Sequence, residues 1–264
     1  MRISSVVIPF IVFLAGIAGS FLRTTELAII FDSYSGLPEH NAFITLVLMA
    51  FSSLFFFITI LFSIRTTVKN AVSDDYDNAF GTDSFAHPAT FMAISTVWLV
   101  ATIVYFLERF SMVNTETIDY VFAGASSLSA VFLMIFAIEV YKNPRRKFLA
   151  LLSVVPTLFM CFWLVLIYRD NASNPVLIEY AYFCLALVFS ATGMYFSSGF
   201  AIGRPVIGKA IVSYTGAAYF CMVTLADNHS MSIKLIIGVI AFMNLFNLSS
   251  LLRNLQKKRR RQAE

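Results

Sequence analysis

The sequence has little charge. Asp, Glu, Lys and Arg make up 13% of its 264 residues, whereas 59% of the residues are hydrophobic. A soluble domain of average composition carries about 25% charged residues, which cover its surface. So apolar a chain excludes an ordinary soluble fold and predicts a protein embedded in a lipid bilayer, with the bilayer as its first partner.

The sequence also lacks the motifs of enzymes and cofactor proteins. It contains no Walker loop, no H-E-x-x-H and no G-x-S-x-G pattern, and its three histidines fall in separate loops. No lysine lies in the middle of an apolar run, where it would be placed to form a Schiff base, and no haem or flavin signature is present. We therefore expect no cofactor, and we rank an enzyme below a binding or transport protein.

Cysteine and acidic residues give no pattern typical of a metal or redox site. The cysteines lie singly within apolar runs, with no C-x-x-C spacing. The stretch SDDYDNAFGTD is acidic enough for a calcium loop, but counting from Asp75 puts Phe80 at the sixth position, where such a loop requires glycine. We expect no metal there, and we interpret residues 65–87 as a solvated cytoplasmic loop.

Long uncharged runs are what the sequence has instead. A helix needs about 20 residues to cross about 30 Å of hydrocarbon, and only helices and closed barrels satisfy their backbone hydrogen bonds in lipid. The runs lack the alternation of barrel strands. Counted from one charged residue or histidine to the next, they are 3–22, 41–64, 88–107, 120–138, 148–168, 180–203, 210–226 and 235–252. The predicted fold is all-α: a polytopic integral membrane protein with eight transmembrane helices in an up-down bundle.

The basic residues predict the orientation of these helices, because cytoplasmic loops retain Lys and Arg. Fifteen of the 19 basic residues fall at the N-terminus, in alternate loops and in the C-terminal tail, and the opposite loops hold Arg23, Arg109, Arg169 and Lys234. Both termini are therefore expected in the cytoplasm. Since the basic residues lie at helix ends rather than on one soluble face, we expect no nucleic-acid partner.

We treat residues 1–264 as one transmembrane domain that ends in a basic cytoplasmic tail, 253–264. The prolines in SVVIP and SVVP, Pro9 and Pro156, have similar spacings to the next outer arginine. This spacing suggests a parallel repeat of four plus four helices, with halves 1–141 and 148–252. An alternative for the first run is a cleaved signal peptide, because small residues follow its apolar core.

The stretch YRDNASNPVLIEY contains our first candidate site residues. Pro175 disfavours helix before it, so the stretch is interpreted as an outer hairpin, with Arg169 and Asp170 as an interfacial pair. Glu179 follows about one turn into the next helix, where a carboxylate approaches hydrocarbon and needs a partner or water. Glu179 is the leading candidate for a functional residue, and packing with a neighbouring charge is the alternative.

Four further residues complete the predicted substrate or ion pathway. Asp227 lies in an outer turn, and Glu139 lies one turn before the cytoplasmic end of its helix, where pairing with Lys142 is the simpler explanation. Asn244 and Asn247 share one face of the last helix near mid-membrane, where amides usually hold helices together. Each residue thus has both a structural and a functional interpretation.

Two classes of function agree with these features. The first is a small-molecule or ion permease, favoured by the repeat and by the intramembrane polar groups. The second is a non-catalytic sensor, scaffold or assembly subunit, whose protein partner would dock on the 65–87 loop or on the tail. The chain has the general character of small multi-pass proteins of the bacterial inner membrane, which is the localisation we expect.

Overall fold

The computed structural model of the protein describes residues 3–30, 43–69, 79–80, 85–111, 116–142, 146–172 and 176–263. Within these residues the chain is all-helical, as predicted. The long helices are α1 (Ile3–Ile30), α2 (Phe43–Lys69), α4 (Ala86–Phe110), α5 (Thr117–Lys142), α6 (Arg146–Asp170), α7 (Leu177–Ala201), α8 (Ile207–Thr224) and α9 (Met231–Ala263). Each uncharged run of the sequence corresponds to one of these helices.

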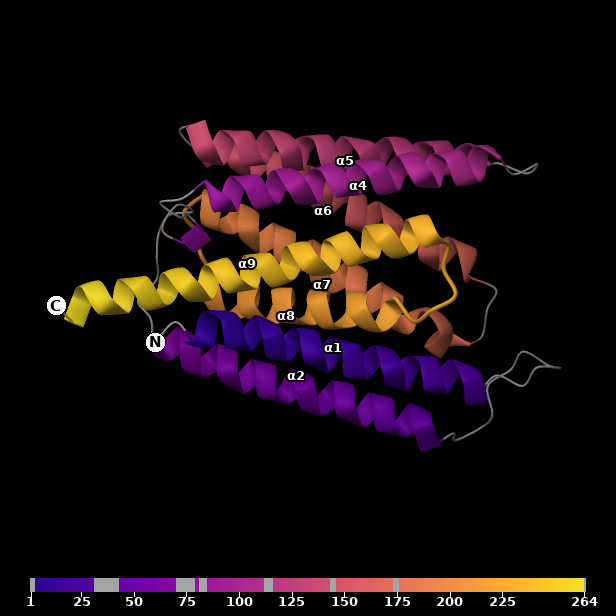
Figure 1. Ribbon diagram of the computed structural model, residues 1–264, viewed down its shortest axis with the longest axis horizontal. Coiled ribbons are helices and arrows are strands. Elements are labelled where there is room, and N and C mark those ends of the chain that lie inside the picture. Colours follow the sequence, from indigo (N-terminus) through magenta and orange to yellow (C-terminus); the bar gives the residue numbers. More distant parts are fainter. Residues whose placement is uncertain are drawn as a thin grey trace.

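The helices run alternately up and down, and α1 begins at the end of the bundle where α9 ends (Figure 1). We call this end the inner end and the opposite end the outer end, following the predicted orientation. The outer end holds the C-terminal parts of α1, α4, α6 and α8. Placing both chain ends on one side of a membrane requires an even number of spans.

Seven of the eight helices are long and apolar enough to cross a membrane, and α8 is not among them. At about 1.5 Å per residue its 18 residues extend about 27 Å, so its polar composition rather than its length sets it apart. Every residue of α8 from Ser213 to Thr224 is buried. Four helices pack against α8, namely α1, α2, α7 and α9. Protein therefore surrounds α8 on the sides where the outer helices of the bundle would face lipid.

Small residues bring α1 close to α8. A Cβ atom on Gly16 would lie 2.6 Å from the Met222 sulfur, and one on Gly19 would lie 2.8 Å from Cγ2 of Val223. Glycines three residues apart share one face of a helix, and in membranes such faces let two backbones approach. The two glycines of α1 therefore let the α1–α2 hairpin pack closely against α8, the central helix of the bundle.

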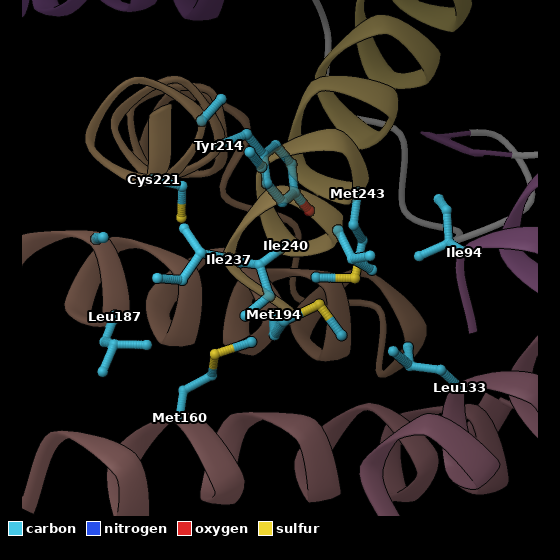
Figure 2. Close-up of a cluster of buried hydrophobic side chains, with 14 of the residues drawn as sticks. Ile94, Leu133, Met160, Leu187, Met194, Tyr214, Cys221, Ile237, Ile240 and Met243 are labelled. Carbon is cyan, nitrogen blue, oxygen red and sulfur yellow. The ribbon is translucent and has the colours of Figure 1, made fainter. Parts of the chain in front are cut away.

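The middle of the bundle is filled by apolar side chains (Figure 2). Met160 of α6, Met194 of α7 and Met243 of α9 lie together, and each is at most 2% exposed. Ile237 and Ile240 of α9 pack around them. Methionine is flexible and fills irregular gaps between helices, so the space between α6, α7 and α9 is a packed core.

The outside of the bundle is apolar too. Large hydrophobic side chains are exposed along the helices, among them Phe57 and Leu61 of α2, Leu158 of α6 and Phe242 of α9. A soluble monomer rarely exposes apolar patches of more than a few hundred Å². An apolar exterior around an apolar core is the distribution of a membrane-embedded protein.

Two residues of the 65–87 loop, Ala79 and Phe80, differ from the expectation of a solvated segment. Phe80 is fully buried at the inner end, with its ring 5.2 Å from that of Phe200 and 6.3 Å from that of Tyr214. The amide nitrogen of Asn254 donates a hydrogen bond to the carbonyl oxygen of Ala79 at 2.9 Å. Burial of an aromatic side chain is favourable, and the Phe80 ring packs against Phe200 of α7 and Tyr214 of α8.

The basic tail continues the last helix. The backbone of α9 is helical to Ala263, so the residues from Arg253 onward extend α9 past the inner end of the bundle (Figure 1). Asn254 and Leu255 are still buried, against the inner end. The tail is therefore attached rigidly to the transmembrane helix, at least as far as Leu255.

Candidate functional site at the outer end

The outer end of α1 contains a buried arginine. The apolar run ends at Arg23, but the helix continues for another seven residues to Ile30. Arg23 therefore lies inside the helix rather than at its end, and its side chain is 0% exposed. Glu26 stands one turn further along the same face and is 1% exposed. A buried guanidinium needs partners for its charge and for its N–H groups.

Those partners come from α1 itself and from the turn between α8 and α9. Nη1 of Arg23 donates to Oε2 of Glu26 at 2.7 Å, and Nε donates to Oδ1 of Asp227, also at 2.7 Å. Asp227 is placed by the turn that follows Thr224, and its side chain is 7% exposed. We call Arg23, Glu26 and Asp227 the Arg23 network. It connects residues 204 positions apart in the chain.

Aromatic side chains border the network. The Arg23 guanidinium carbon lies 5.2 Å from the ring centre of Tyr182 on α7, which is within the range of a cation–π contact. Below it, toward mid-membrane, the Tyr219 hydroxyl of α8 and the Ser52 hydroxyl of α2 are 2.8 Å apart. The network is thus held between α1, α7 and α8, away from bulk water.

The Arg23 network carries more negative than positive charge. One guanidinium faces two carboxylates, and each carboxylate uses only one of its oxygens for Arg23. The other two oxygens, Oε1 of Glu26 and Oδ2 of Asp227, are buried and have no hydrogen-bond partner among the described residues. Because an unpaired buried carboxylate oxygen is costly, the site requires a proton, a water molecule or a bound donor.

His229 lies beside these oxygens. Its Nε2 atom is 3.9 Å from Oδ2 of Asp227 and is buried without a described partner, and its ring packs 4.7 Å from that of Phe183. Burial, and to a lesser extent the positive charges of Lys234 and Arg23, lower the pKa of His229 to about 4. The imidazole is therefore neutral at pH 7, and its contact with Asp227 is not an ion pair.

Asp227 itself is affected by two opposing influences. Burial raises its pKa, and the Arg23 guanidinium, which binds the charged form, opposes that rise. The net direction is upward. Asp227 is therefore protonated more easily than an ordinary aspartate, whereas the neighbouring His229 is protonated less easily than an ordinary histidine.

Arg169 and Asp170 belong to a second, more open group at the outer end. Nε and Nη2 of Arg169 donate to Oδ1 of Asp170 at 2.9 and 2.8 Å, and Nη2 is 3.7 Å from Glu116. Arg109 and Asp119 lie nearby, 3.5 Å apart, around a polar cavity of about 290 Å³. Arg169 and Asp170 are about half exposed, so water screens these pairs.

The two asparagines of α9 lie deep in the bundle. Asn244 is 0% exposed, and its amide nitrogen donates to the Ile240 carbonyl of its own helix at 2.9 Å. Its Oδ1 is buried without a described partner, and a Cβ on Gly193 of α7 would lie 3.0 Å from it. Asn247, three residues on, is also buried.

The remaining two candidates lie apart from these groups. Glu139 is half-buried near the inner end of α5, at the opposite end of the bundle from the Arg23 network. Glu179 lies in the first turn of α7, and its side chain is outside the described residues. Of the six predicted site residues whose side chains the structure describes, Asp227 alone belongs to the Arg23 network.

The sequence pointed only weakly to the Arg23 network. It assigned Arg23 and Asp227 to the outer side, but only Asp227 was a candidate site residue. What the sequence did not reveal is that α1 continues past Arg23 to Ile30. A charged residue ends an uncharged run, but it does not have to end the helix. Tyr182 gave no signal at all, since tyrosines near membrane interfaces are common.

No trio of His, Cys, Asp or Glu side chains is positioned to hold a metal ion in the part of the chain that the structure describes. Comparisons with protein-family models, with curated proteins and with solved structures found no match. The fold and the outer end therefore define the class on their own: a multi-helix membrane protein with a buried ionic network at one end of its bundle.

Proposed function

We propose that the protein is a membrane-embedded binding protein of the sensor or scaffold class, which binds a small organic cation at the Arg23 network. One observation carries this proposal. Oε1 of Glu26 and Oδ2 of Asp227 are buried beside a single arginine and have no described donor. A bound cation supplies both the missing donors and the missing positive charge.

The chemistry of the site favours an ammonium group over a metal ion. Carboxylate oxygens only accept hydrogen bonds, and a primary ammonium has three donors. Glu26, Asp227 and the neutral His229 offer three acceptors around Arg23. With no trio of metal-binding side chains among the described residues, the site suits one charge shared through hydrogen bonds rather than direct coordination.

The position of the network supports a sensing role. Arg23 ties α1 to the turn between α8 and α9, so a ligand that competes for Glu26 or Asp227 changes how tightly the α1–α2 hairpin is held. The packed methionine core between α6, α7 and α9 favours binding without transport. On this hypothesis the protein partner docks at the inner end, on the 65–87 loop or the basic tail 253–264.

A permease is the second candidate, and Asn244 is the observation that favours it. Its amide oxygen is buried near mid-membrane without a described partner, and both this oxygen and the Tyr214 ring lie against Gly193. The Tyr214 hydroxyl is 2.6 Å from that of Ser197. On this hypothesis Glu179, Asn244 and Asn247 line a path from the outer end. Glu139 then couples an ion at the inner end.

The first experiment measures thermal stability of the purified protein in nanodiscs against a series of primary, tertiary and quaternary ammonium compounds. A ligand at about 100 times its dissociation constant adds about 2.7 kcal/mol to the free energy of unfolding. We expect stabilisation by primary amines that is lost in Glu26→Gln and Asp227→Asn. Asp170→Asn is the matched control, because it also converts an outer carboxylate to an amide, and it should retain the effect.

Equal stabilisation of all three variants, or equal effects of primary and quaternary ammonium ions, would refute binding at this site. Transport is tested separately, by uptake of a stabilising amine into proteoliposomes. Uptake that is abolished in Asn244→Leu, while thermal stabilisation by the amine persists, would establish the permease over the sensor. Binding without uptake would establish the sensor over the permease.

A further inference from the structure

The outer half of the bundle has a groove on its lipid-facing surface, between α4 and α9. Its volume is about 510 Å³, and its lining is almost entirely apolar. The main apolar walls are Ile94 and Val97 of α4 and Leu235, Val239 and Phe242 of α9. Val97 and Phe242 are each about half exposed, so the groove opens outward from the bundle rather than toward its core.

The groove is long enough for one leaflet of a bilayer. On α9 it extends from Met231 to Phe242, a rise of about 17 Å at about 1.5 Å per residue. Half of a hydrocarbon core of about 30 Å is about 15 Å. Gly238 lies on α9 between Met231 and Phe242, and a Cβ atom on Gly238 would meet no atom within 4 Å. A missing side chain thus leaves room halfway along the groove.

Lys234 is the charged residue of this groove, near its outer end. The three other basic residues of the outer end are each paired: Arg23 with two carboxylates, Arg109 with Asp119, and Arg169 with Asp170. Lys234 makes no ion pair or side-chain hydrogen bond with any described residue. Its charge acts electrostatically on Asp227 and His229 without forming an ion pair with either. A half-buried lysine at the top of an apolar groove thus places a positive charge at the level where lipid headgroups lie.

We propose that this groove binds an anionic phospholipid of the surrounding bilayer, with one acyl chain between α4 and α9 and the phosphate on Lys234. The apolar walls match an acyl chain, the length matches one leaflet, and the positive charge of Lys234, which forms no ion pair with a described residue, matches the phosphate. The open position at Gly238 lets the chain lie against the backbone of α9. This inference does not depend on the proposed cation site.

Lipid binding is measured by native mass spectrometry of the detergent-purified protein, titrated with phosphatidylglycerol and with phosphatidylcholine of the same acyl chains. One basic residue near a membrane surface contributes a preference of about fivefold for anionic lipid. We expect such a preference in the parent protein and its loss in Lys234→Gln. Lys209→Gln is the matched control, because Lys209 is exposed on α8 at the inner end, outside the groove.

A second variant tests the acyl-chain part of the site without changing charge. Gly238→Leu fills the open position, and leucine favours helix more than glycine does, so the variant is expected to fold. Both phospholipids should then bind less tightly by a similar factor. A melting temperature close to that of the parent shows that Lys234→Gln and Gly238→Leu retain the fold.

Three results would overturn the proposal. The first is equal binding of the two lipids to the parent protein. The second is the same loss of preference in Lys209→Gln as in Lys234→Gln, which would mean general surface charge. The third is binding of a free fatty acid that depends on Lys234 while phosphatidylglycerol binding does not, which would assign the groove to a different ligand.

Discussion

The buried Arg23 network makes a strong prediction about stability. In Arg23→Gln, two bonds of 2.7 Å are lost, and two carboxylates that are at most 7% exposed lose the guanidinium with which they form ion pairs. Removing one member of a buried ion pair typically costs about 3–5 kcal/mol. For a chain of about this size, 1 kcal/mol corresponds to about 2–4 °C, so we expect the melting temperature to fall by about 6–20 °C.

The assay is thermal unfolding in nanodiscs, followed by the fluorescence of the two tryptophans. Arg169→Gln is the matched control, because it removes an outer arginine whose pair with Asp170 is about half exposed, and it should leave the melting temperature unchanged. The triple variant Arg23→Met, Glu26→Gln, Asp227→Asn removes all three charges and should recover most of the loss. An Arg23→Gln shift no larger than that of Arg169→Gln would show that water reaches the network, and the reasoning above would be wrong.

Three further predictions concern pH, helix contacts and the inner end. The folded-state pKa of His229 is about 4, below its usual 6.5, so its stabilising effect is complete above pH 6.5 and is lost as the pH falls toward 4, by up to about 3 kcal/mol. The melting temperatures of the parent and His229→Gln should therefore differ increasingly over that range, and parallel curves would exclude this titration. Gly19→Ala brings a methyl group against Val223 and should cost about 1–3 kcal/mol, whereas Gly124→Ala, which meets nothing within 4 Å, should be neutral or stabilising in the same melting assay. Phe80→Ala should cost about 3–5 kcal/mol in thermal unfolding, and a shift within error would mean that this ring is solvated.

The helices were predictable from the sequence because they are a local property. A run without charge in a membrane protein has no alternative to helix, since lipid cannot satisfy its backbone hydrogen bonds. Helix ends were less predictable. The first run stops at residue 22, but α1 continues to Ile30, because Arg23 and Glu26 have partners that make their burial tolerable. The repeat of halves 1–141 and 148–252 and the cytoplasmic position of both termini stay predictions.

The candidate site was only partly predictable, for a different reason. The sequence predicted Arg23, Arg169 and Asp227 on the outer side, because charge avoids the hydrocarbon. It could not show which of them meet, since an ion pair between α1 and the α8–α9 turn depends on how distant helices pack. Phe80 was misplaced for the same reason, because its burial depends on Phe200 and Tyr214.

By itself the sequence determined that this chain is a membrane-embedded bundle of long helices, since composition and run length alone set the free energy of transfer into lipid. Only the tertiary structure decided that α8, the described long helix that is not apolar enough to count as a span, is the central helix, that Arg23 pairs with Asp227, and that Lys234 lines an apolar groove. These features depend on which helices are neighbours, and neighbours are chosen by the shapes of whole helix faces rather than by any local pattern of residues.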